Sequence, residues 1–332
     1  GVLFRRRVRR MLRRPPLLVA LILGGALLLL PLAAFVQLPG ERSAKELLGI
    51  NLRGCNIFEK AEGGWRDEPD MPSLRDGPAS ATMGDQVYLV GGIAEFSDDY
   101  DRARSVDDVE RYDVSTGKYE KLPPLPRRLN HVHVAASEGV LYVLGGSGDG
   151  LRAGEVTAES WRLDLRTNRW QRIAPLPTPR GEGDVAVMGG RIYVVGGRAG
   201  RASLGAVESY DPQSDSWRTH ASMPTRRDHL AVAVYSGELY ALGGRQEDDV
   251  SRPTLESYDP ATDRWTSLPD MPGIKAGFAF VTTREGLVAV GGENLAKRQL
   301  YGATYRYVPQ QQRWDRLRGM EKPRHGFGHG YV

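Results

Sequence analysis

The chain has 332 residues, enough for one large domain or two ordinary ones, and its 40 glycines and 21 prolines are typical of a fold with many tight turns. Residues 1–14 contain seven arginines and no acid, so the net charge of +4 leaves −3 for everything that follows. The folded part therefore lacks the basic surface expected of a nucleic-acid-binding protein. Cys55 is the single cysteine, which excludes an internal disulfide.

An uncharged apolar stretch runs from Leu17 to Leu38. As a helix it would be about 33 Å long, enough to cross a hydrocarbon core of about 30 Å. A cleaved signal peptide and a buried core helix are the alternatives, but a signal peptide has a shorter apolar core that ends in small residues. The stretch predicts an uncleaved transmembrane signal-anchor helix over residues 15–39. The positive-inside rule then places the basic tail 1–14 in the cytoplasm and the rest outside it, in the periplasm or at the cell surface, with residues 40–62 as a juxtamembrane linker.

A repeat of 47–54 residues occupies the remaining chain. Its first fixed point is a glycine pair that ends an apolar strand, at Gly91-Gly92, Gly145-Gly146, Gly196-Gly197, Gly243-Gly244 and Gly291-Gly292. Its second is an aromatic residue 26 positions before each pair, at Trp65, Tyr119, Trp170, Trp217 and Trp265. Between them lies a Tyr-Asp strand such as Ser209-Tyr210-Asp211, followed by a turn and the aromatic strand, which indicates a hairpin. A period of this length with several strands predicts propeller blades.

These motifs resemble the kelch repeat family over residues 63–332, with departures at Tyr119, Trp161 and Val308. The resemblance implies an all-β fold, a six-bladed kelch-type β-propeller with four-stranded blades. Residues 63–72 match only the outer strand of a blade, and the segment from Arg324 onward matches only a first strand. We therefore expect the two ends to close the ring together, with the last blade incomplete.

Basic residues recur near the start of each repeat, three positions after a Met-Pro, a Leu-Pro or its equivalent, with one lying a step early; they are Arg75, Arg128, Arg180, Arg227, Lys275 and Arg324. Kelch adaptors that capture acidic peptides use arginines here and just after the glycine pair, so the resemblance adds Arg198 and Arg245. The eight residues are predicted to form a ligand-binding basic ring at the mouth of the central channel. The alternative is that each basic residue pairs with an acid of a neighbouring blade, such as Asp76, Glu182 or Asp228.

Histidines offer a weaker signal for a metal site. His131 and His229 occupy matching places in their repeats, but the corresponding positions elsewhere are Gly77, Glu182 and Gly277. Because no complete ligand set is visible, no metal and no cofactor are predicted. Cys55 lies outside the propeller, which excludes the copper-radical chemistry of galactose oxidase, a kelch-like propeller.

The pattern as a whole favours a non-enzymatic, membrane-tethered propeller outside the cytoplasm that binds a protein, an acidic peptide or a glycan. A sugar mutarotase or epimerase of the sialate mutarotase type is the alternative, because those export-compartment kelch proteins use polar residues at the channel mouth.

Overall fold

The computed structural model describes residues 22–23, 26–27, 56–59, 64–94, 104–148, 155–273 and 275–329. The chain divides into two compact units, Gly1–Ser43 and Ala44–Val332. In the first unit, β1 (Ile22–Leu23) and β2 (Ala26–Leu27) pair antiparallel, so these four residues are extended rather than helical. The rest of the predicted membrane helix, residues 15–39, lies outside the described residues. Within the described part of the chain, no helix has the length and apolar character needed to span a bilayer.

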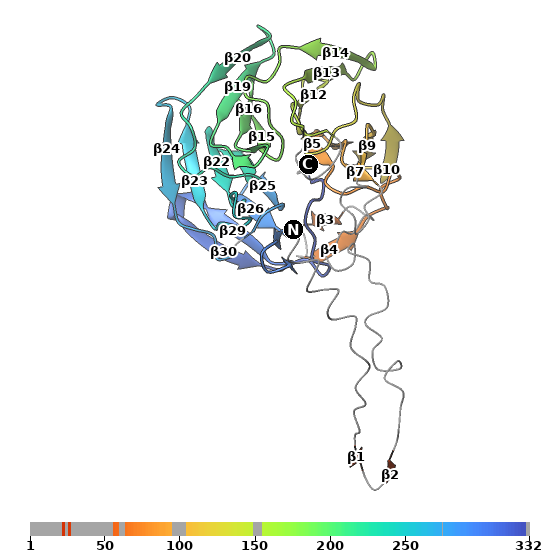
Figure 1. Ribbon diagram of the computed structural model, residues 1–332, viewed down its shortest axis with the longest axis vertical. Helices are drawn as coiled ribbons and strands as arrows, with labels where there is room; N and C mark the ends of the chain where they lie inside the picture. The colour runs from red at the N-terminus through yellow and green to blue at the C-terminus, as the bar shows by residue number, and fades with distance from the viewer. Residues whose placement is uncertain are drawn as a thin grey trace, which may run out of the picture. The chain divides into compact units, whose positions relative to one another are not determined.

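The second unit contains five four-stranded antiparallel sheets, arranged as blades around a common centre (Figure 1). Blade 1 comprises β5 (Ala79–Met83), β6 (Gln86–Val90), β9 (Val109–Asp113) and β10 (Lys118–Lys121). Blade 2 comprises β11 (His133–Ser137), β12 (Val140–Leu144), β13 (Ser160–Asp164) and β14 (Arg169–Ile173). Blade 3 comprises β15 (Asp184–Met188), β16 (Arg191–Val195), β19 (Val207–Asp211) and β20 (Ser216–Thr219).

Blade 4 comprises β21 (Ala231–Tyr235), β22 (Glu238–Leu242), β23 (Leu255–Asp259) and β24 (Arg264–Leu268). Blade 5 comprises β25 (Ala279–Thr283), β26 (Gly286–Val290), β29 (Thr304–Val308) and β30 (Arg313–Leu317), with the 3₁₀ turn η3 (Pro309–Gln311) before its last strand. Short pairs lie in the loops that follow three glycine pairs: β7 (Ile93–Ala94) with β8 (Arg104–Ser105), β17 (Arg198–Ala199) with β18 (Ala202–Ser203), and β27 (Glu293–Asn294) with β28 (Gln299–Leu300).

The predicted six blades are therefore five in the part of the chain that the structure describes. The segment expected to be an outer strand does form β4 (Gly64–Asp67), but its partner is β3 (Asn56–Glu59) in a separate two-stranded sheet. Residues 324–329 form no strand, so the expected first strand of a split blade is absent from these residues.

The C-terminal segment nevertheless lies between blade 5 and blade 1. The Gly326 N–H donates to the Gly277 carbonyl at 3.0 Å, and the Gly77 N–H donates to the Gly326 carbonyl at 2.9 Å. The same kind of bond joins the residues at corresponding positions of blades 2 to 5. The six residues of this inner series are Gly77, His131, Glu182, His229, Gly277 and Gly326, and all have φ between 47° and 61°. The C-terminal segment thus takes a sixth place in the inner series without forming a sixth blade.

Repeated side chains hold the blades together at a larger radius. The indole N–H of Trp217 in blade 3 donates to the Ala174 carbonyl at the end of blade 2, at 2.9 Å, and the Trp217 ring lies 5.3 Å from that of Tyr210. The glycine pairs permit close approach between blades near the centre: a Cβ on Gly196, whose φ is 63°, would lie 2.7 Å from the carbonyl oxygen of Arg227, which precedes β21 of blade 4. The two fixed points of the repeat are therefore contacts between successive blades.

Candidate functional site

Six of the eight predicted binding residues are buried. Arg75, Arg180, Arg227, Lys275 and Arg324 expose between 0% and 6% of their surface, and Arg245 exposes 9%. Arg128 is exposed, because the residue of blade 2 that is equivalent to these buried basic residues is Leu129. The backbone shows this equivalence: the Gly92 N–H donates to the Leu129 carbonyl, just as the Gly146 N–H donates to the Arg180 carbonyl. Arg198 and Arg245 contact Glu182 and Asp228, acids in the loops that enter blades 3 and 4. Ligand binding by all eight stays a prediction.

Each buried arginine of blades 1, 3 and 4 crosses its own blade to a glutamate on the third strand. The ion pairs are Arg75–Glu110 at 2.8 Å, Arg180–Glu208 at 2.6 Å and Arg227–Glu256 at 2.7 Å. Each guanidinium also donates to a carbonyl of the second strand, such as that of Val194 for Arg180 at 3.1 Å. Burial lowers the pKa of Arg227 to about 10 in spite of its partner. The predicted acids Asp76, Glu182 and Asp228 are not the partners of these arginines.

In blades 2 and 5, other side chains occupy the two positions that the arginine and the glutamate occupy in blades 1, 3 and 4. The residue four positions before the first strand is Leu129 in blade 2, where the second residue of the third strand is Trp161, and both belong to one apolar cluster. In blade 5 the corresponding residues are Lys275 and Tyr305: the Lys275 ammonium lies 5.1 Å from the Tyr305 ring centre and donates to the Ala303 carbonyl at 2.6 Å. Burial lowers the pKa of Lys275 to about 8.

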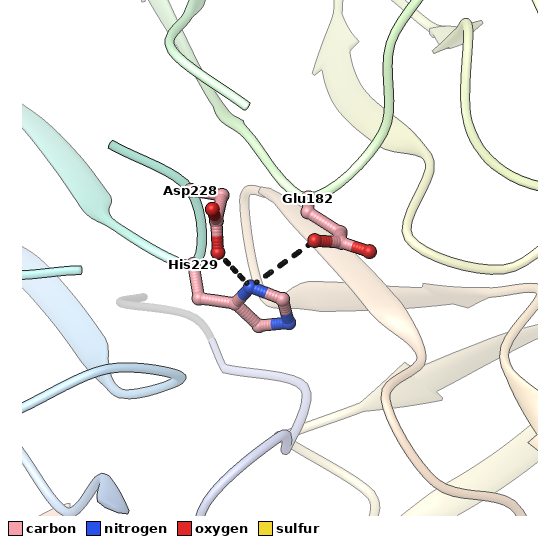
Figure 2. Close-up of side chains that lie close together, drawn as sticks. All are labelled: Glu182, Asp228 and His229. Carbon is pink, nitrogen blue, oxygen red and sulfur yellow. Dashed lines mark hydrogen bonds and ion pairs between the residues drawn. The ribbon is translucent and has the colours of Figure 1, made fainter. Parts of the chain in front are cut away.

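The loops that enter blades 3 and 4 bring three chemically active side chains together, as Figure 2 shows. Glu182 precedes β15, and Asp228 and His229 precede β21. The Nδ1 atom of His229 lies 2.7 Å from Oδ1 of Asp228 and 3.5 Å from Oε2 of Glu182. One donor atom of each residue lies within 4.8 Å of the other two. Two carboxylates and an imidazole this close can hold a proton or a metal ion.

Arginines flank this cluster and fix its protonation. The Arg245 guanidinium contacts Oδ1 of Asp228 at 3.2 Å and Nε2 of His229 at 3.1 Å. Because arginine only donates, Nε2 must accept, which leaves the imidazole proton on Nδ1, facing Asp228. Burial opposes the charge of Asp228, but hydrogen bonds from His229 and Ser203 still hold the pKa of this carboxyl below its ordinary value. Arg198 lies 3.9 Å from Oε2 of Glu182.

Two further histidines lie near the same loops. The His131 ring is 5.3 Å from that of His229, and its Nδ1 lies 2.6 Å from the Asn130 side-chain oxygen. Burial lowers the pKa of His131 to about 4, so its imidazole is neutral at physiological pH. His325 lies 3.5 Å from Glu293. Glu182 interrupts the histidine series in the sequence, whereas in the structure its carboxylate is a partner of His229.

The sequence of residues 87–332 matches the model of the Attractin/LZTR1 beta-propeller family, in accord with the repeated four-stranded blades. The chain belongs to this family. It is also 29% identical over 196 residues to Kelch repeat and BTB domain-containing protein 12 of Danio rerio, covering 54% of this chain and 31% of that protein. Kelch-like protein terF of Aspergillus terreus is 30% identical over 47% of this chain and 35% of its own length. Beta-scruin of Limulus polyphemus is 35% identical over 45% of this chain and 16% of its own length.

The matched regions thus span about a third or less of these relatives. The kelch-type propeller predicted from the repeat is confirmed. The activities of these complete relatives therefore depend on further regions outside the matched propeller.

Proposed function

We propose that the protein is a membrane-tethered kelch propeller outside the cytoplasm that binds an acidic segment of a partner protein at its channel mouth. Arg198 and Arg245 carry this proposal. They follow the second strands of blades 3 and 4 and contact Glu182 and Asp228 in the entering loops, whereas Arg75, Arg180 and Arg227 are paired inside their own blades. A propeller suits such a role because rigid blades hold the loops in place. Family membership supports a binding module, and the mutarotase alternative has no observation of its own among the described residues.

Ligand carboxylates would compete with the acids that now face these two arginines. The Arg198 side chain is 23% exposed and its contact with Glu182 is long, at 3.9 Å. Arg245 divides its donors between Asp228 and Glu293. A charge-assisted contact to a ligand contributes about 1.5–3 kcal/mol when water is excluded. The site is therefore suited to a weak or moderate ligand that presents more than one carboxylate.

A binding experiment tests the ligand class. A library of acidic peptides and an array of acidic glycans are screened with the full-length chain, and binders are measured again with Arg198→Ala plus Arg245→Ala. We expect peptide affinity to fall at least tenfold in the double variant, and to fall also in Arg198→Ala alone, whose melting temperature should change little because this side chain is partly exposed. The double variant should melt at a lower temperature, because Asp228 and Glu293 are buried and lose the Arg245 guanidinium. Arg169→Ala, which removes an exposed arginine of the outer strand β14 outside the predicted set, is the matched control. Equal binding by the double variant, or binding of glycans alone, would reject an acidic peptide ligand at these arginines.

Topology is tested separately in intact cells. The arginine-rich residues 1–14 and the apolar stretch 17–38 support an N-terminus in the cytoplasm. A cysteine introduced at the exposed Arg128, in a chain whose Cys55 is replaced by serine, should react with a membrane-impermeant reagent. Protection of this cysteine until the membrane is permeabilised would reject an external propeller.

A further inference from the structure

The cluster of Glu182, Asp228 and His229 has the donor atoms of a metal site (Figure 2). We propose that these three residues bind a divalent transition metal ion of the zinc class at the seam between blades 3 and 4. Two oxygens and one imidazole nitrogen are a donor set that such ions accept, with a coordination position left open for water or a ligand. The proposal stands whether or not the propeller binds a partner protein.

The distances within the cluster are close to those that an ion requires. Ligand bonds to Zn²⁺ of about 2.0–2.2 Å in tetrahedral geometry place neighbouring donors about 3.4 Å apart. Nδ1 of His229 and Oε2 of Glu182 are already 3.5 Å apart. The 2.7 Å contact of Nδ1 with Asp228 is a hydrogen bond, so the ion would replace its proton and widen this contact by about 0.7 Å.

Charge also favours a cation. Glu182, Asp228 and Glu293 face two guanidiniums, those of Arg198 and Arg245, so three carboxylates exceed the two fixed positive charges. Arg245 has partners to retain if it gives up Asp228 and His229. Its Nη1 lies 3.4 Å from Glu293, and its Nε lies 3.8 Å from Asp249. An arriving ion therefore does not leave the guanidinium without a carboxylate.

The Glu182 carboxylate supplies an independent observation. Its Oε2 atom is inaccessible to water and has no hydrogen-bond partner; it makes only the longer ionic contacts with His229 and Arg198. A buried carboxylate oxygen without a hydrogen bond is costly unless a cation satisfies it. The oxygen points at Nδ1 of His229, which is where the ion would bind.

The backbone of both loops adds to the case. Glu182 has φ of 61° and His229 has φ of 50°, as His131 beside the cluster has φ of 47°, whereas the other three positions of the inner series are the glycines Gly77, Gly277 and Gly326. A side chain in this left-handed region costs about 1–2 kcal/mol. Retaining two metal-binding side chains at positions suited to glycine is consistent with a function for those side chains.

The test uses the full-length chain, purified without a histidine tag and treated with a chelator. Titration calorimetry with Zn²⁺ should show one ion per chain, and Zn²⁺ should raise the melting temperature. Glu182→Gln, which keeps size but removes charge, should weaken binding at least tenfold, and His229→Ala should do the same. His325→Ala is the matched control, because His325 is also 3.5 Å from a glutamate, Glu293, yet lies outside the cluster. Its affinity should equal that of the unmodified chain.

Co²⁺ provides a second readout that does not depend on stability. Its visible absorption should appear on binding to the unmodified chain and to His325→Ala, and should be lost in Glu182→Gln. The site is rejected if no saturable binding occurs at millimolar Zn²⁺, or if folded Glu182→Gln and His229→Ala both bind as tightly as the unmodified chain. Because no partner protein is present, failure here leaves the proposed function unaffected.

Discussion

Blades 2 and 4 differ in the pair of side chains that joins the residue four positions before the first strand to the second residue of the third strand. Blade 4 holds the Arg227–Glu256 ion pair, fully withdrawn from water, whereas blade 2 holds Leu129 packed in the same apolar cluster as Trp161. The four strands of blade 2 have the same lengths and order as those of blade 4. The fold therefore requires two side chains that match each other rather than a charge at this place. Such matching means that a change on one side alone should be far more harmful than a change on both.

The largest expected effect comes from breaking one ion pair on one side. Arg227→Met leaves Glu256 buried without its guanidinium and should lower the free energy of unfolding by about 3–5 kcal/mol. Arg180→Met should behave alike, because Glu208 is also buried. Urea denaturation followed by tryptophan fluorescence measures the change.

Arg128→Ala is the control for that experiment. It removes an exposed arginine one residue before Leu129, and its effect should stay within about 0.5 kcal/mol. Similar losses in the Arg227 and Arg128 variants would contradict the role assigned to the buried pair.

Lys275 of blade 5 gives the next largest effect, visible as a dependence on pH. Burial lowers its pKa from 10.5 to about 8, so between these values the unfolded chain binds the proton that the folded chain has lost. The titration of Lys275 should therefore raise the free energy of unfolding by about 3 kcal/mol between pH 8 and 10.5. Below pH 8, burial of the charged ammonium lowers the stability by this full amount. Lys275→Met should lack this rise. Identical pH profiles of melting temperature for the two proteins would refute the argument.

Replacing the Arg227–Glu256 pair of blade 4 by the Leu–Trp pair of blade 2 should change the free energy of unfolding less than either single replacement. Arg227→Leu combined with Glu256→Trp removes both charges, so the double variant should be more stable than the sum of the single variants by about 1–3 kcal/mol. A double-mutant cycle in urea measures this coupling energy. Strict additivity would show that the two positions do not depend on each other.

The smallest effect concerns the outer contacts. In each of blades 2 to 5, a tryptophan N–H donates a hydrogen bond of 2.9–3.1 Å to a backbone carbonyl just after the last strand of the preceding blade. Tyr119 of blade 1 makes the corresponding contact with the Pro69 carbonyl, at the longer distance of 3.5 Å. Tyr119→Trp should stabilise the protein by about 0.5–1 kcal/mol through a better hydrogen bond. The reverse change, Trp217→Tyr, should destabilise it. Thermal melts of both variants check the sign.

The blades could be predicted from sequence because each repeats the same packing, so glycine pairs and aromatics recur at fixed spacing. The pairing of Arg227 with Glu256 does not follow from the sequence, because Glu256 lies on the third strand, 29 residues away, rather than beside the arginine. The charge of Arg128 predicts the wrong residue in blade 2, because the carbonyl of Leu129 makes the hydrogen bond that the repeated basic residues make in other blades. The cluster at Glu182 could not be predicted from one repeat, because its members come from two blades that only the ring brings together.

The inner series has a consequence for how the molecule opens. The His229 N–H donates to the Glu182 carbonyl at 2.6 Å, and Gly277, Gly326 and Gly77 continue the series from blade to blade. None of these hydrogen bonds belongs to a single blade, so fraying of one sheet does not break them. Their amide protons can exchange with deuterium only when neighbouring blades separate. Exchange at these few positions therefore measures the free energy of parting the blades, independently of the stability of each sheet.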